Sequence, residues 1–98
     1  MRPIGPGDVA AAAWALRKVP DSRRAALAER MLTHAQAADK YRKRLGRAHP
    51  RWGCGSLMDV AGTYPRRAEP FWDDPEYLRC VMVILSAICA VRGAEVRE

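Results

Sequence analysis

Residues 73–93 read DDPEYLRCVMVILSAICAVRG, a hydrophobic run with the marks of a helix at both ends. Asp74 can accept hydrogen bonds from the free amides of a first helical turn, and Pro75 suits the first helical position because no donor is needed there. Gly93 suits the left-handed residue that follows a helix. The run therefore predicts a helix that begins after Asp74 and ends before Gly93.

This predicted helix is apolar around most of its circumference. Between residues 78 and 91 only Arg79 and Ser86 are plainly polar. Such a helix must be enclosed by other helices or by a second subunit, so we expect it at the centre of the core. A narrow stripe of polar or small side chains runs along it at spacings of three and four: Glu76, Arg79, Val83, Ser86, Ala90 and Gly93.

The N-terminal part predicts an irregular leader and a first helix. Residues 1–7 are rich in Pro and Gly, which favours irregular structure. Asp8 can cap a helix over residues 9–18, which Pro20 ends. Trp14 falls on the side of this helix opposite its other apolar residues. It is either covered by the chain or a second subunit, or exposed as a binding contact.

The longest predicted helix begins at about residue 21, with Asp21 or Ser22 as its cap, and ends at about Leu45, before Gly46. Its apolar and small side chains recur with His34 at intervals of four and three, which is a heptad pattern. No second His or Cys lies one turn from His34, so we interpret it as a core or edge histidine. The pattern comprises Leu27, Met31, His34, Ala38, Tyr41 and Leu45.

A loop with a Pro turn, Trp52 and two glycines leads to a short predicted helix over residues 57–63. Ser56 followed by Asp59 matches a capping box at its start. Two interpretations of the glycines remain open. They let a phosphate approach the helix N-terminus, or they only form the turn that folds Trp52 over the core.

These elements predict one all-α domain over residues 1–98. It is a small helical bundle of three longer helices and one short helix, with the apolar C-terminal helix at its centre. Residues 64–72 are a connector whose Phe71 and Trp72 are placed to pack on the last helix, and residues 94–98 are expected to fray. Because 98 residues build only a small core, we expect the chain to form a homo-oligomer.

Charge is unevenly distributed along the chain, whose formal net charge is +6. Residues 1–52 hold twelve Arg or Lys against four acids, and residues 53–98 hold five against seven. Cations at a helix C-terminus complement the helix dipole, but the cluster at the end of the long helix exceeds that need. Such a cluster suits sequence-independent contact with nucleic-acid phosphates. Its members are Lys40, Arg42, Lys43, Arg44, Arg47 and Arg51.

The sequence offers no catalytic or metal-binding signature, so we expect no enzyme, no cofactor and no metal. Three cysteines have no paired spacing, and His49 and Cys54 lack a companion pair that would complete a zinc site. The adjacent carboxylates Asp73 and Asp74 are explained by capping of the last helix.

The expected location is the cytoplasm. The N-terminal residues lack the apolar segment of a signal peptide, and three unpaired cysteines fit a reducing compartment. The apolar run over residues 81–91 is too short to cross a bilayer, so we interpret it as core and expect no membrane partner.

Several segments together resemble a group of short alphaproteobacterial proteins known only as a domain of unknown function. They are RP at 2–3 with GDV at 7–9, AADKYR at 37–42, HPRWG at 49–53 with SLM at 56–58, and EPF at 69–71 with DDP at 73–75. The resemblance implies a bacterial, cytoplasmic, helical protein. It implies no activity and no site.

Two functional hypotheses follow. The first is a non-catalytic interaction protein whose basic face contacts nucleic-acid phosphates without reading sequence. The alternative is a protein-binding adaptor or assembly subunit, for example an accessory component of a phage-like particle, with Trp14, Trp52 and the aromatic connector as its contact surface.

Overall fold

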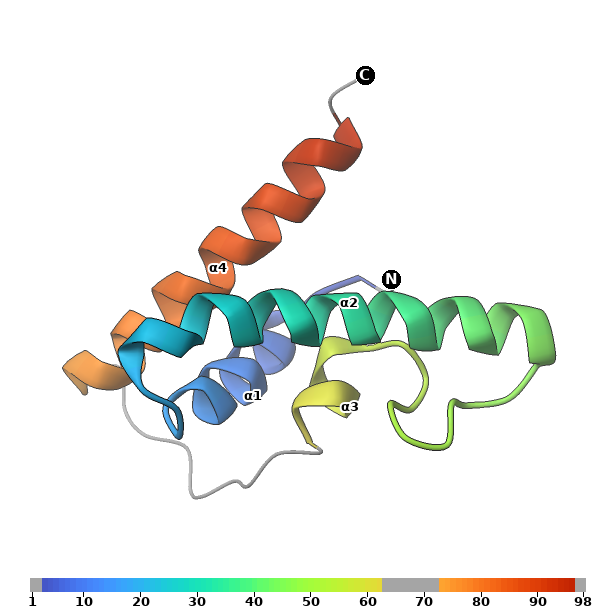
Figure 1. Cartoon of the computed structure of the whole chain (residues 1–98), viewed down its shortest axis with the longest axis horizontal. Coiled ribbons are helices and arrows are strands. Elements are labelled where there is room, and N and C mark those ends of the chain that lie inside the picture. Colours follow the sequence, from blue (N-terminus) through green and yellow to red (C-terminus); the bar gives the residue numbers. More distant parts are fainter. Residues whose placement is uncertain (1–2, 63–72, 97–98) are drawn as a thin grey trace.

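The computed structural model describes residues 3–62 and 73–96, which form four helices and no strand. This confirms the predicted all-α bundle of three longer helices and one short helix. In Figure 1, α2 runs along one side of α1 and α3, and α4 crosses behind it. The bounds are α1 (Pro6–Leu16), α2 (Asp21–Leu45), α3 (Leu57–Ala61) and α4 (Pro75–Val96).

The most completely enclosed helix is α1. All six residues from 11 to 16 are buried, and α2, α3 and α4 all contact this helix. Its run of alanines explains this position, because small side chains on every side let three neighbouring helices approach closely. Trp14 is only 5% exposed. The chain itself therefore covers Trp14, and the alternative that it is an exposed binding contact is wrong.

The first helix starts earlier than predicted. It begins at Pro6, so residues 6 and 7 are helical and the irregular leader is shorter than residues 1–7. Asp8 is not the N-cap but lies in the first turn, where its Oδ2 accepts a hydrogen bond from the amide of Gly5 at 2.9 Å. Its Oδ1 accepts a second hydrogen bond from the amide of Met58 at 2.9 Å. Asp8 thus ties the start of α1 to the start of α3.

Neither predicted residue caps α2, and Arg24 instead joins its start to the end of α1. Pro20 occupies the N-cap position without a side-chain hydrogen bond, and Asp21 instead pairs with Arg24 at 3.0 Å. Arg24 is 5% exposed, and its Nε donates to the carbonyl oxygens of Leu16 and Val19, both at 3.1 Å. The guanidinium therefore satisfies carbonyl groups at the end of α1. Sequence spacing gave no sign of this role.

The predicted starts of α3 and α4 are confirmed. Ser56 Oγ accepts a hydrogen bond from the amide of Asp59 at 3.1 Å. Asp74 Oδ1 accepts hydrogen bonds from the amides of residues 76 and 77 at 3.0 and 3.1 Å. The predicted end of α4 is wrong, because the helix continues through Gly93 to Val96. Residues 94–96 are therefore helical, not frayed.

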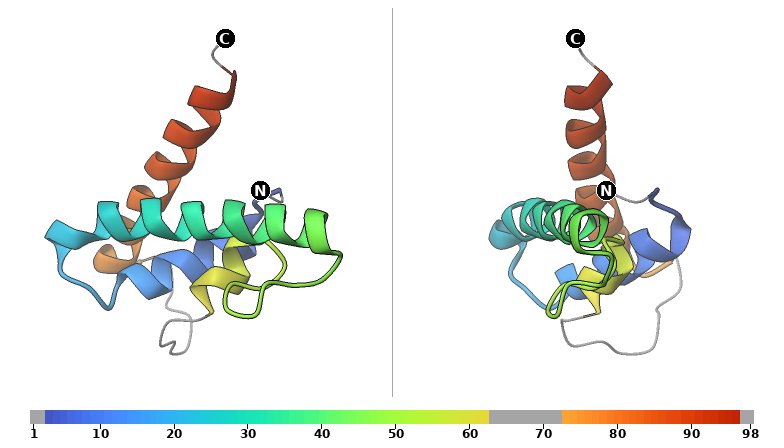
Figure 2. Two further views of the ribbon diagram at one scale, coloured as in Figure 1. Left: turned by 45° about the vertical axis from the view of Figure 1, so that its right-hand side comes forward. Right: turned by 90° about the vertical axis from the view of Figure 1, so that its right-hand side faces the viewer.

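The enclosure predicted for α4 holds only for its first half. Among residues 75–93, the buried residues of this helix are Tyr77, Cys80, Val81 and Ile84. Ala87, Ile88 and Val91 are only partly buried against the core, and the end of the helix projects outward, as both views in Figure 2 show. The predicted connector, with Phe71 and Trp72, lies outside the described residues.

Candidate nucleic-acid interface

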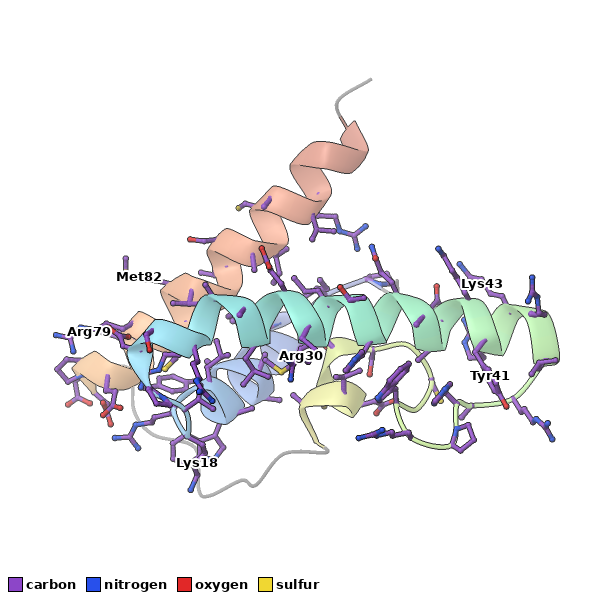
Figure 3. The ribbon with its side chains drawn as sticks, viewed as in Figure 1. Lys18, Arg30, Tyr41, Lys43, Arg79 and Met82 are labelled. Atoms are coloured by element: carbon purple, nitrogen blue, oxygen red, sulfur yellow. The ribbon has the colours of Figure 1, made fainter. Side chains whose placement is uncertain are left out.

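The six predicted phosphate contacts lie at one end of the molecule. Lys40, Arg42, Lys43 and Arg44 belong to the last part of α2, and Arg47 and Arg51 belong to the loop that follows it. Five of the six are exposed, and Arg42 is half-buried. Figure 3 shows Tyr41 and Lys43 at this end, far from Lys18 and Arg79 at the other.

A buried carboxylate forms ion pairs with two of these cations. Asp39 is 2% exposed, and its oxygens lie 3.0 Å from Lys43 Nζ and 3.2 Å from an Arg42 amino group. The hydrogen bond from Lys43 is the largest influence on the Asp39 carboxyl, and with that from Arg42 it holds the pKa well below its ordinary value. Arg42 and Lys43 therefore have a structural task in addition to any contact with a ligand.

The other four cations have no such task. Lys40, Arg44, Arg47 and Arg51 form no ion pair with any residue in the two described ranges, and all four are exposed. Gly46 lies between them with a φ of 72°, the left-handed conformation predicted for the residue after the helix. This turn sends the chain back along α2. Arg47 and Arg51 are thereby brought to the same end of the molecule as the helical cations.

The loop over residues 46–56 is held closely against α2. Gly55 packs so tightly that an added Cβ would lie 2.6 Å from Asp39 Cα. Arg42 Nε donates a hydrogen bond to the Cys54 carbonyl oxygen at 3.2 Å. Both contacts join the loop to the final turns of α2. The basic residues of the loop therefore have a defined position relative to those of the helix.

Three aromatic rings form a second attachment of the loop. The Trp52 ring stacks on His34 of α2 and on His49 of the loop, with centroid distances of 4.1 and 4.5 Å and interplanar angles of 8° in both cases. Tyr41 meets His49 edge-on at 4.8 Å. Trp52 is half-buried and packs against the core. This arrangement corrects the sequence-based assignment of Trp52 as an exposed contact.

Each histidine in the stack has a structural explanation. His49 Nδ1 accepts hydrogen bonds from the amides of Arg51 and Trp52, at 3.0 and 3.1 Å. Burial lowers the pKa of His34, and the neighbouring charges of Arg30 and Arg51 lower it further. The sequence marked His34 as a core or edge residue but could not reveal the stack, because His34 lies 15 positions before His49 and 18 before Trp52.

Carboxylates already engage two amides of this segment. The amide of Cys54 donates to Asp59 Oδ2 at 3.0 Å, and the amide of Met58 donates to Asp8 Oδ1 at 2.9 Å. These hydrogen bonds favour the interpretation in which the glycines only form a turn. Within the described ranges no group of three or more His, Cys, Asp or Glu residues is placed to hold a metal ion.

Charge at the opposite end of the molecule is largely compensated. There, Arg17 pairs with Asp74 at 2.8 Å and Arg24 pairs with Glu76 at 2.8 Å. These pairs join the end of α1 and the start of α2 to the start of α4. Lys18, Arg23 and Arg79 are also exposed towards this end and form no ion pair among the described residues, but several acids lie there too: Asp21, Asp73, Asp74 and Glu76. The excess of positive charge is therefore at the C-terminal end of α2.

The fold and this surface define a small helical bundle with one basic end. The chain belongs to the family described as Domain of unknown function (DUF7742), which matches residues 2–88. The resemblance to a domain of unknown function is therefore confirmed. No curated protein and no solved structure matches the chain. Across the described residues, every helix is too short or too polar to traverse a lipid bilayer.

Proposed function

We propose that this protein is a non-catalytic, cytoplasmic interaction protein that contacts nucleic-acid phosphates without reading sequence. The observation that carries the proposal is the group of four exposed, unpaired cations at one end of the described structure: Lys40, Arg44, Arg47 and Arg51. Each cation that neutralises a phosphate releases counterions, which favours binding to any nucleic acid.

The attached loop supports this proposal. A cation on a free loop loses conformational entropy when it binds, and a cation already held in place loses less. The tight packing of Gly55 and the hydrogen bond from Arg42 hold the loop that carries Arg47 and Arg51. Arg42 and Lys43, which are engaged with Asp39, are expected to contribute less to affinity than the four unpaired cations.

The test is binding of the purified chain to labelled duplex DNA, single-stranded DNA and RNA, measured by fluorescence anisotropy at two salt concentrations. Four phosphate contacts predict a duplex affinity that falls about 150-fold between roughly 50 and 200 mM salt. The double variant Arg44→Glu/Arg47→Glu removes two contacts, which should reduce this salt dependence to about 12-fold and weaken binding at both concentrations.

The matched control is Arg23→Glu. Arg23 is also exposed on α2, but it lies 21 positions before Arg44, about 32 Å along the helix axis. It should lower affinity far less than either change at the basic end. Absence of binding at the lower salt, or equal losses from Arg23→Glu and Arg44→Glu, would contradict the proposal.

Absence of nucleic-acid binding would favour the alternative of a protein-binding adaptor or assembly subunit, for example in a phage-like particle. Such a protein would not use Trp14 as a contact, because Trp14 is buried, and two histidine rings of the chain itself already stack on Trp52. Copurification of a partner with the intact chain would then identify the surface that is used.

A further inference from the structure

One face of α4 exposes apolar side chains that nothing in the described structure covers. Met82 is 66% exposed and Leu85 is 46% exposed. Between Arg79 and Arg92 the helix carries no charged residue, although it projects away from the other helices. A long uncharged helical surface of this kind marks a site of association.

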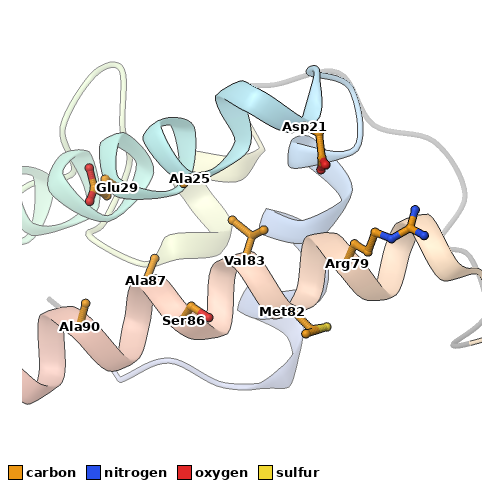
Figure 4. Close-up of a pocket in the computed structure, with 9 residues that line it drawn as sticks. All are labelled: Asp21, Ala25, Glu29, Arg79, Met82, Val83, Ser86, Ala87 and Ala90. Carbon is orange, nitrogen blue, oxygen red and sulfur yellow. The ribbon is translucent and has the colours of Figure 1, made fainter.

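The exposed residues share one face of the helix. Successive members are separated alternately by three positions and by one, so they form a continuous strip along α4. We call this strip the α4 seam. A groove of about 550 Å³ between α4 and α2 borders the seam on one side, and Figure 4 shows Met82 and Ser86 at its edge. A second groove, of about 330 Å³, borders it beside Leu85 and the N-terminal segment. The seam comprises Met82, Leu85, Ser86, Cys89, Ala90 and Gly93.

We propose that the α4 seam binds the α4 seam of a second copy of this chain, with the two helices antiparallel. A two-fold axis between residues 87 and 88 places every larger seam residue opposite a smaller one. Met82 then faces Gly93 of the second copy, Leu85 faces Ala90, and Cys89 faces Ser86. Large side chains packed against small ones let two helices approach closely without leaving cavities.

The opposite orientation does not give this fit. In a parallel pair Met82 would meet Met82 and Gly93 would meet Gly93, which crowds one end of the seam and leaves a gap at the other. A parallel pair would also bring both globular parts to the same end of the helices. In the antiparallel pair each globular part lies beside the projecting end of the other α4, where Figure 2 shows no other helix. The second copy is thus accommodated in one orientation.

Both large exposed side chains of the seam, Met82 and Leu85, are apolar, and pairing with a second copy would place each of them against a small residue. The seam carries no charge, so pairing two copies brings no like charges together at its centre. A nucleic acid, in contrast, would find no cation on this strip.

The first test compares two variants by sedimentation over about two decades of protein concentration. Leu85→Glu places a charge in the seam of both copies and should raise the dimer dissociation constant at least about 100-fold. Leu45→Glu is the matched control, because Leu45 is 50% exposed, as Leu85 nearly is, but lies at the end of α2. It should leave the dimer unchanged. A wild-type chain that stays monomeric, or a Leu85→Glu dimer as stable as the control, would overturn the proposal.

A second test needs no disruptive change. Met82→Cys and Gly93→Cys variants are prepared separately, each with Cys54→Ser and Cys89→Ser, and one carries a tag that alters its size. Mixing them under mild oxidation should give a reducible cross-link between the two variants. Either variant alone should link poorly, because the two copies of residue 82 lie 11 positions apart, about 16 Å along the axis. Equal linking within one variant would overturn the antiparallel arrangement.

Discussion

Replacing Gly55 with Ala should destabilise the chain far more than the same change at Gly46. Both glycines have positive φ, 98° and 72°, a conformation that costs a residue with a Cβ about 1 kcal/mol or more. At Gly46 nothing lies within 4 Å of the added Cβ, so this is the whole cost. At Gly55 the Cβ would lie 2.6 Å from Asp39 Cα and 2.9 Å from its backbone nitrogen.

The clash at residue 55 is with the backbone of α2, which cannot yield without breaking the helix. The loop must therefore move away. That movement removes the hydrogen bond from Arg42 to Cys54, worth about 1 kcal/mol, and disturbs the Trp52 stack, worth about 1 kcal/mol more. The total loss is about 3 kcal/mol for Gly55→Ala against about 1 kcal/mol for Gly46→Ala.

Thermal unfolding followed by circular dichroism measures the difference. For a chain of this size Gly46→Ala should lower the melting temperature by about 4–8 °C, and Gly55→Ala by at least about 12 °C. Equal losses for the two variants would refute the argument that the loop packs directly on α2. Because the displaced loop carries Arg47 and Arg51, Gly55→Ala should also weaken nucleic-acid binding under conditions where both variants are folded.

Two further predictions concern pH. The pKa of Asp39 is lowered in the folded chain, so the unfolded chain binds a proton at this carboxyl more readily. The Asp39 carboxylate therefore stabilises the folded chain above about pH 4, and this stabilisation is lost as pH falls further. Asp39→Asn should cost at least about 2 kcal/mol at pH 7, and its deficit in urea unfolding should shrink towards pH 2.5; a constant deficit would contradict this. The pKa of His34 is also lowered in the folded chain, so the unfolded chain binds a proton at this imidazole more readily. Neutral His34 therefore stabilises the folded chain above about pH 6.5, and this stabilisation is lost as pH falls towards 5. His34→Phe keeps a ring against Trp52 and should reduce the fall in urea midpoint over this interval, whereas an unchanged fall would exclude His34 as its source.

Local sequence determined the helices and most of their ends. Asp74 before Pro75 marked the start of α4, and Ser56 marked the start of α3, because a capping side chain acts on amides two or three residues away. Gly46 marked the end of α2 for the same kind of local reason. Gly93 did not end α4, since a glycine permits a left-handed turn but does not require one.

Only the tertiary structure decided what each helix packs against and which charges remain unpaired. The sequence placed an apolar C-terminal helix at the centre, yet α1 is the enclosed helix, because burial depends on which elements meet. The sequence showed the six clustered cations, but it did not show which of them form ion pairs and which stay unpaired. Asp39 occupies Arg42 and Lys43 through spacings of three and four on one helix face, whereas Arg47 and Arg51 acquire their places from a loop held by residues distant along the chain.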